Sequence, residues 1–387
     1  MNAIVPMRRL VPLLLLLAMV GPLTLNILQP SLPGLEKALS APKETVQLTL
    51  SLYLLGMAGS QVIAGPMADR FGRRPIILIA LVIFIIASFA ASQVHSIEML
   101  ILARVVQAFG ATSCLSLSRT IIADVSNRET TMRIIASITM VMVLAPMASP
   151  NIGSFLDTRF GWPSIFLFCA VFGVITIAIM AAWLPETRPA KLQNATFSAV
   201  TLRTLALARN PAFLRQAGIA SFASAAFFII LGATPHVIIN AMQRTPAEFS
   251  LWFILLGVGY ALGNFTVTRN GHRMARIMWI GNFMLLAGAA IMAGLALVPV
   301  MHPAAVFAPA VLVTYGNGLV LPNAMASGIQ TDREAAGAAS GLMGFAQMSL
   351  GAIFSYLAGL APNGTPLAMS LMILGCGLLA VVLTMRR

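Results

Sequence analysis

Long apolar segments recur along the whole 387-residue chain and constrain its fold more than any other feature. A helix of about 20 apolar residues crosses the ~30 Å hydrocarbon core of a bilayer. Numbered below as spans 1 to 12, the segments lie near residues 10–32, 45–66, 75–93, 99–122, 132–155, 163–184, 213–240, 249–268, 275–299, 303–328, 336–360 and 366–385. Only 9% of the residues are charged, against about 25% in soluble domains. The chain therefore lacks the polar surface of a soluble protein, and lipid is its natural solvent.

The spans predict helices, because each is continuously apolar, whereas a barrel strand alternates between apolar and polar residues. One polar interval, 185–212, is much longer than the others and contains Pro185, Pro189 and Pro211. We expect it to separate an N-terminal half, 1–186, from a C-terminal half, 213–387, through a cytoplasmic linker, 187–212. The predicted fold class is an all-α integral membrane protein with twelve transmembrane helices in two six-helix halves.

The distribution of Lys and Arg predicts the orientation. Nineteen of the 24 basic residues lie on the side of the N-terminus and the linker, four lie in loops on the opposite side, and Arg104 lies within span 4. Both termini are therefore expected in the cytoplasm, with the chain in a bacterial inner membrane. The +13 net charge is scattered singly between apolar runs, so it does not indicate a nucleic-acid surface. Arg8 and Arg9 before an apolar stretch resemble a secretory signal, but the stretch continues to Leu32, which favours a retained span.

An internal repeat supports the division into halves. Arg70-Phe71-Gly72-Arg73-Arg74 follows span 2, and the same R-x-G-x-R spacing returns in 269–273 after span 8, displaced by 199 residues. Positive-inside bias alone produces such patterns by chance, but a displacement of half the chain favours a repeat. Two repeated six-helix halves are typical of transporters whose substrate site lies at the repeat interface.

Three motifs resemble the major facilitator superfamily. Residues 65–74, GPMADRFGRR, resemble its G-x-x-x-D-R-x-G-R-R signature between spans 2 and 3. Residues 104–110, RVVQAFG, resemble its R-x-x-Q-G-x-G motif, with Ala108 in place of the first glycine. Residues 145–153, APMASPNIG, resemble the span-5 antiporter motif of the Bcr/CflA drug-efflux branch, with Pro146, Pro150 and Gly153 as its marked positions. Together with 26–33, 119–124 and 337–345, the resemblance covers essentially the whole chain.

The resemblance implies efflux of small organic molecules by alternating access, with proton antiport. Members of the branch usually carry a span-1 aspartate used in proton coupling, but the matching position here is Asn26. An amide does not titrate near neutral pH. Three alternatives stay open: proton-coupled efflux, a metabolite uniporter or symporter without proton antiport, and a receptor or assembly protein without transport.

The resemblance also implies a cytoplasmic gate, in which Asp69 caps span 11 and Arg73 pairs with Asp124 in the outward-facing state. The alternative is that these charges only set the topology. The expected gate residues are Gly65, Asp69, Arg70, Gly72, Arg73, Arg74, Arg119 and Asp124.

Arg104 is expected to face the protein interior, because a lipid-facing guanidinium costs about 2.5–3.5 kcal/mol or more. No Asp or Glu lies well inside a span. Arg104 is then either a structural hydrogen-bonding residue or a positive charge that attracts an anionic substrate or repels a carried proton. His236 in span 7 is a second candidate proton carrier, since an unperturbed histidine titrates near pH 6.5; the alternative is a hydrogen-bonded histidine at the outer end of its span.

Other polar or aromatic residues that interrupt the spans are candidates for a substrate and coupling cavity. For each one, a structural interhelical hydrogen bond is the alternative. The expected cavity residues are Asn26, Gln29, Tyr53, Arg104, Gln107, Asn151, His236, Tyr260 and Gln347. In span 5, Pro146 and Pro150 are expected to bend the helix, and Gly153 to allow close packing on the other half.

The sequence shows no pattern for an enzyme site, a metal site or a cofactor. It contains no G-x-x-x-x-G-K-[ST] run, and its histidines and carboxylates are dispersed. The expected partners are a small-molecule substrate, protons and the lipid bilayer, with no nucleic acid, and the chain is expected to be a monomer.

Overall fold

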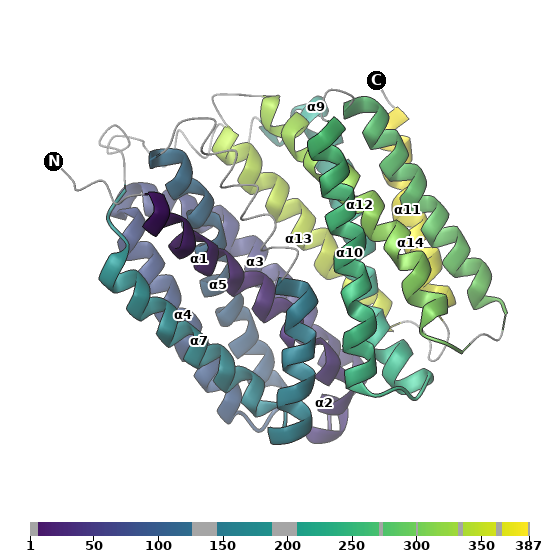
Figure 1. Cartoon of the computed structure of the whole chain (residues 1–387), viewed down its shortest axis with the longest axis horizontal. Coiled ribbons are helices and arrows are strands. Elements are labelled where there is room, and N and C mark those ends of the chain that lie inside the picture. The colour runs from purple at the N-terminus through teal and green to yellow at the C-terminus, as the bar shows by residue number, and fades with distance from the viewer. Residues whose placement is uncertain are drawn as a thin grey trace.

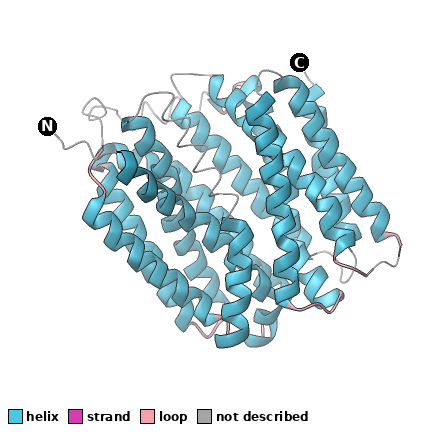
Figure 2. Ribbon diagram, in the orientation of Figure 1, coloured by secondary structure: helices cyan, strands magenta, loops and turns pink. Residues whose placement is uncertain are grey.

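The computed structural model describes residues 7–125, 145–187, 207–270, 274–298, 301–331, 336–360 and 366–385. Within these ranges every regular element is a helix and no strand occurs (Figures 1 and 2). Eleven of the described helices are long and apolar enough to cross a membrane. Of the twelve predicted spans, only span 5 is missing from these eleven: 132–144 lie outside the described residues, and 145–160 are helical. The predicted all-α membrane fold is confirmed.

The helices follow the predicted spans closely. In chain order they are α1 (Met7–Ile27), η1 (Gln29–Ser31), α2 (Leu32–Ala38), α3 (Lys43–Phe71), α4 (Arg73–Gln93), α5 (Ile97–Val125), α7 (Pro163–Trp183), α9 (Pro211–Pro235), η3 (His236–Ala241), α10 (Pro246–Asn270), α11 (Met274–Ala296), α12 (Ala304–Gln330), α13 (Ala336–Leu360) and α14 (Leu367–Met385).

Span 1 is longer and less regular than the sequence predicted. It was expected to end near residue 32, but apolar helix continues to Ala38 through the 3-10 turn η1 and the short helix α2. Pro30 lies in this turn, where its missing N–H removes a helical hydrogen bond. Gln29 lies in this turn, and Glu36 lies beyond it in α2.

Span 7 changes from an α-helix to a π-helix near its end. α9 ends at Pro235, and His236–Ala241 continue as the π-helix η3. Single π-helical turns inside longer helices are uncommon and occur frequently at functional sites. This turn carries His236, one of the predicted cavity residues.

The buried apolar side chains form two clusters. One lies entirely within Leu10–Leu184. The other consists mostly of residues between 207 and 376, and it also includes six side chains from the first part of the chain, which are Leu25, Leu50, Tyr53, Leu54, Met57 and Ala108. We call residues 7–187 the first half and 207–385 the second half.

The two halves meet along α3 and α13, which pack side by side (Figure 1). Gln47 Nε2 donates to Ser355 O at 3.0 Å near one end of this contact. Near the other end, the amide of the Gln61 side chain packs directly against Gly344.

The ends of the bundle are named here from Figure 1. α1 begins and α14 ends at one end, called the terminal end, and α2 lies at the opposite end, called the distal end. At the distal end, η1 contacts α9 and α10, and α2 contacts η3. The distal end therefore joins the two halves.

Candidate functional site

Arg104 on α5 is the most buried charged side chain of the site. It is only 1% exposed. Its Nη1 donates to Gln107 Oε1 at 2.8 Å and to the carbonyl of Thr24 on α1 at 3.1 Å. Gln107 lies one turn further along α5 and donates in turn to Ser88 Oγ on α4 at 2.8 Å. Arg104 thus connects three helices of the first half.

Aromatic rings complete the surroundings of this guanidinium. Its carbon lies 3.9 Å from the ring centroid of Tyr53 on α3 and 6.0 Å from that of Phe166 on α7. A cation over an aromatic face is attracted by the negative face of the ring. Two of the predicted cavity residues, Tyr53 and Gln107, therefore contact Arg104.

The charge of Arg104 has no ionic counterpart among the described residues. Its contacts are a carbonyl, an amide and two neutral rings. Its Nε is buried without a hydrogen-bond partner. A buried charge is normally paired, because desolvating it unpaired is costly.

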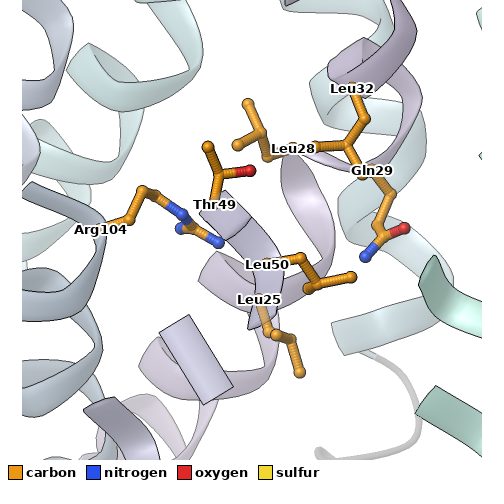
Figure 3. Close-up of a pocket in the computed structure, with 7 residues that line it drawn as sticks. All are labelled: Leu25, Leu28, Gln29, Leu32, Thr49, Leu50 and Arg104. Atoms are coloured by element: carbon orange, nitrogen blue, oxygen red, sulfur yellow. The ribbon is translucent and has the colours of Figure 1, made fainter. Parts of the chain in front are cut away.

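A narrow gap opens beside Arg104. It leaves no room for a water molecule, and its lining is Leu25, Leu28, Gln29, Leu32, Thr49, Leu50 and Arg104. Figure 3 shows the guanidinium entering this gap from one side and the amide of Gln29 from the other. Gln29 is 1% exposed, and neither atom of its amide has a partner. The gap is therefore apolar around two polar side chains that keep unpartnered hydrogen-bonding atoms, Arg104 Nε and the amide of Gln29.

Asn26 is buried on α1, two residues beyond Thr24. Its Nδ2 donates to the carbonyl of Pro22 at 2.8 Å, and its Oδ1 has no partner. Only the amide nitrogen of Asn26 therefore has a hydrogen-bond partner, and that partner lies in its own helix.

His236 lies close to a carboxylate of the other half, a contact that the sequence did not predict and that is an ion pair when the imidazole is protonated. Its Nδ1 lies 3.1 Å from Glu36 Oε1 on α2. The His236 and Glu36 side chains are only 6% and 24% exposed. His236 therefore lies at the distal end of the bundle and not beside Arg104.

Asn151 also bridges the halves at this side of the molecule. Its Nδ2 donates to Met147 O at 3.0 Å within its own helix and to Ser250 O on α10 at 3.3 Å. Ser250 Oγ donates back to Pro150 O at 3.0 Å. The carbonyl of Pro150 thus receives a bond from the other half.

Gly153 packs differently from the prediction. It was expected to approach the other half, but a Cβ added there would lie 1.8 Å from Ile27 O on α1, which belongs to the same half. The close approach to the second half occurs one and a half turns earlier, where Met147 fills the space beside Gly257 on α10. Pro146 is half-buried at the start of the described part of this helix.

Two predicted cavity residues lie among the helices of the second half. Gln347 on α13 accepts from Ser224 Oγ at 2.9 Å and contacts Met325 Sδ at 3.0 Å. Tyr260 on α10 is half-buried, and its carbonyl accepts from Asn264. The nine predicted residues therefore do not form one cluster: Tyr53, Arg104 and Gln107 do, Gln29 lies across the gap, and the others make separate contacts.

Only part of the predicted gate lies within the described side chains. The described side chains do not include those of Gly65, Asp69, Arg119 and Asp124. The expected Arg73–Asp124 pair therefore also lies outside the described side chains. Gly72 has a φ of +103°, a conformation that glycine adopts without strain. Arg70 is exposed and lies 5.3 Å from the ring centroid of Phe71.

Glu186, which the sequence reasoning missed, holds the loop of this gate. Its carboxylate accepts from the backbone N–H of Arg73 at 2.9 Å and of Arg74 at 3.2 Å. These are the first two residues of α4, so the carboxylate lies at the positive end of the helix dipole. Arg74 Nη2 also donates to Ala181 O on α7 at 2.6 Å.

Among the described residues, no group of three or more His, Cys, Asp or Glu side chains is placed to hold a metal ion. Cys114, Cys169 and Cys376 are buried and unpaired.

Known proteins with similar sequences include several bacterial proteins named for drug resistance. Multidrug resistance protein D of Escherichia coli is 27% identical and aligns over 96% of this chain and 93% of its own. A bicyclomycin resistance protein homolog of Haemophilus influenzae is 28% identical and aligns over 88% of this chain and 86% of its own. A chloramphenicol resistance protein of Pseudomonas aeruginosa is 28% identical over 72% of this chain and 65% of its own.

Solved structures give the same fold. The crystal structure of a D-xylose–proton symporter superposes with a TM-score of 0.77, covers 98% of this chain and 97% of its own, and is 14% identical. Residues 14–356 match the family model of the Major Facilitator Superfamily. The chain is therefore a multi-pass membrane transporter, not an enzyme, and it belongs to the Major Facilitator Superfamily.

Proposed function

We propose that the protein exports small organic molecules, antimicrobial compounds among them, across the inner membrane. The observation that carries the proposal is the similarity, over 96% and 88% of the chain, to proteins named for multidrug and bicyclomycin resistance. The buried polar group around Arg104 supports the proposal as well, because it faces an apolar gap that would widen into a site for such a molecule when the halves separate.

Alternating access is the transport mechanism we propose, with the regions 1–186 and 213–387 as the moving bodies and 187–212 as their linker. Three contacts between the halves support it, because all lie toward the distal end: Glu36–His236, Asn151–Ser250 and Ser250–Pro150. Breaking them would open a path from the distal side. With the terminal end in the cytoplasm, as the basic residues indicate, the distal end faces outward.

Proton antiport is the first candidate for coupling, on the resemblance to the drug-efflux branch. A carrier without proton antiport is the second candidate, and a specific observation favours it. The buried residue at the usual aspartate position is Asn26, and its amide cannot exchange a proton near neutral pH.

Growth of an overexpressing strain on bicyclomycin and chloramphenicol tests the export function. We expect raised tolerance with the wild-type chain and none with Asp69→Asn at equal membrane abundance. The Asp69 substitution leaves the basic residues of the loop in place, so insertion should be unchanged. Equal tolerance with and without the protein, across these compounds and a wider antimicrobial panel, would contradict the proposal.

A further inference from the structure

The charge balance at Arg104 indicates what kind of molecule the gap accepts. A guanidinium keeps its proton under all physiological conditions. Within the described part of the chain, its neighbours are neutral: the Thr24 carbonyl, the Gln107 amide and the rings of Tyr53 and Phe166. The site therefore carries a net positive charge in a region shielded from water.

The hydrogen-bonding groups of the gap that lack a partner also suit an anionic ligand. Arg104 Nε is a buried donor without an acceptor, and Gln29 brings a second unpartnered amide group to the opposite wall (Figure 3). Both groups can donate to the oxygens of a carboxylate or sulfonate. Charge-assisted bonds from Arg to such groups are short and strong.

The apolar residues of the lining determine what kind of molecule can carry the anionic group. Leu25, Leu28, Leu32 and Leu50 make the wall between the two polar groups apolar. The gap leaves no room for a water-sized molecule, whereas ordinary ligand pockets begin near about 300 Å³. A ligand therefore needs the halves to move apart, and Leu25 and Leu50 already belong to the apolar cluster of the second half.

From this charge and geometry we infer that the exported substrates include small aromatic or aliphatic anions, whose anionic group binds Arg104 and Gln29. The inference rests on the proposed export function and adds the substrate class. It also favours the second coupling candidate over proton antiport, because an anion driven by the membrane potential needs no proton carrier at Asn26. A membrane potential of 100 mV, negative inside, favours the outward movement of one negative charge by about fifty-fold in concentration ratio.

Binding to the purified full-length protein tests the substrate class. The probes are 2-naphthalenesulfonate and 2-naphthoate, each compared with its neutral isostere, the sulfonamide and the carboxamide. We expect each anion to bind at least tenfold more tightly than its isostere. Arg104→Gln should abolish this preference, and Arg104→Lys, which keeps the charge, should retain most of it. Arg276→Gln removes an exposed arginine of α11 and should change nothing.

Transport of 2-naphthalenesulfonate into or out of proteoliposomes tests the driving force, since a sulfonate stays charged at every relevant pH. A potassium gradient with valinomycin sets 100 mV without a pH gradient, and we expect accumulation on the positive side that approaches fifty-fold. A pH gradient with the potential clamped at zero should produce no accumulation.

Two results would overturn the inference: isosteres that bind as tightly as the anions, or an anion preference that survives Arg104→Gln. Failure of both anions to bind would overturn it as well. If neutral or cationic compounds are exported while the anions are not, only the substrate class fails. If the protein moves no compound and confers no tolerance, the proposed export function fails with it.

Discussion

The Glu36–His236 contact predicts a measurable change in how often the distal end opens. Nδ1 and Oε1 lie 3.1 Å apart, and the two side chains belong to different halves. An ion pair that is partly shielded from water contributes more than the roughly 0.2–1 kcal/mol of an exposed pair, and we take about 1.4 kcal/mol for this one. Losing it should raise the ratio of open to closed distal ends by about tenfold.

Either side chain can be removed to break the pair. Glu36→Ala, His236→Ala and the double variant should therefore have nearly equal effects, because each single change already removes the whole interaction. Glu248→Ala is the matched control. Glu248 forms its 3.8 Å ion pair with Arg244 within the second half, so its loss should leave the opening unchanged.

A cysteine reporter at Ser31 measures the opening. Ser31 is 1% exposed in η1, which contacts α9 and α10 of the second half. We expect a membrane-impermeant maleimide to label Ser31→Cys about tenfold faster in all three variants. The native cysteines are buried, and protein without the reporter gives their background.

Two outcomes would refute the reasoning about this contact. Unchanged labelling rates in the single variants would mean that the contact does not hold the distal end closed. A double variant that labels about a hundredfold faster would mean that the two residues act separately and not as a pair.

Sequence alone predicted the spans well, because the requirement for about 20 apolar residues is independent of how helices pack. Span 3, predicted at 75–93, is α4 at Arg73–Gln93. The prediction was wrong at the end of span 1, where the polar residues Glu36 and Lys37 stopped the hydropathy pattern, although helix continues through them.

The interior position of Arg104 and its bond to Gln107 follow from local rules. A guanidinium is costly in lipid, and residues three apart on a helix are neighbours. The Thr24 carbonyl and the Tyr53 ring come from other helices. Their identity depends on how each helix is rotated about its axis, which a nearly all-apolar sequence does not specify.

The Glu36–His236 pair shows the same limit more sharply. The two residues are separated by 200 positions, and each lies in a local irregularity, α2 and the π-helix η3. No spacing rule connects them. Gly153 shows the same limit. The sequence indicated that a small residue is needed there, but not that α1 is the helix that packs against it.

The remaining predictions concern packing, the gate loop and coupling. Gly153→Ala places a Cβ 1.8 Å from Ile27 O, so we expect a loss of about 1–3 kcal/mol from overpacking, measured as a lower melting temperature; Gly375→Ala, where a Cβ meets nothing within 4 Å, should show no loss. Glu186→Gln removes the charge that caps α4 and should cost about 1 kcal/mol at low salt, with a smaller loss at high salt in the same melting assay. Asn26→Asp adds a carboxylate to the helix whose Thr24 carbonyl binds Arg104. In its ionised form the new carboxylate would neutralise the site, so we expect anion binding to weaken at least tenfold at pH 8 and to recover at low pH as the carboxyl group takes up a proton. Because that proton must be exchanged during transport, the variant should also respond to a pH gradient that leaves the wild type unaffected. Unchanged anion binding at pH 8 in Asn26→Asp would show that this position does not share the field of Arg104.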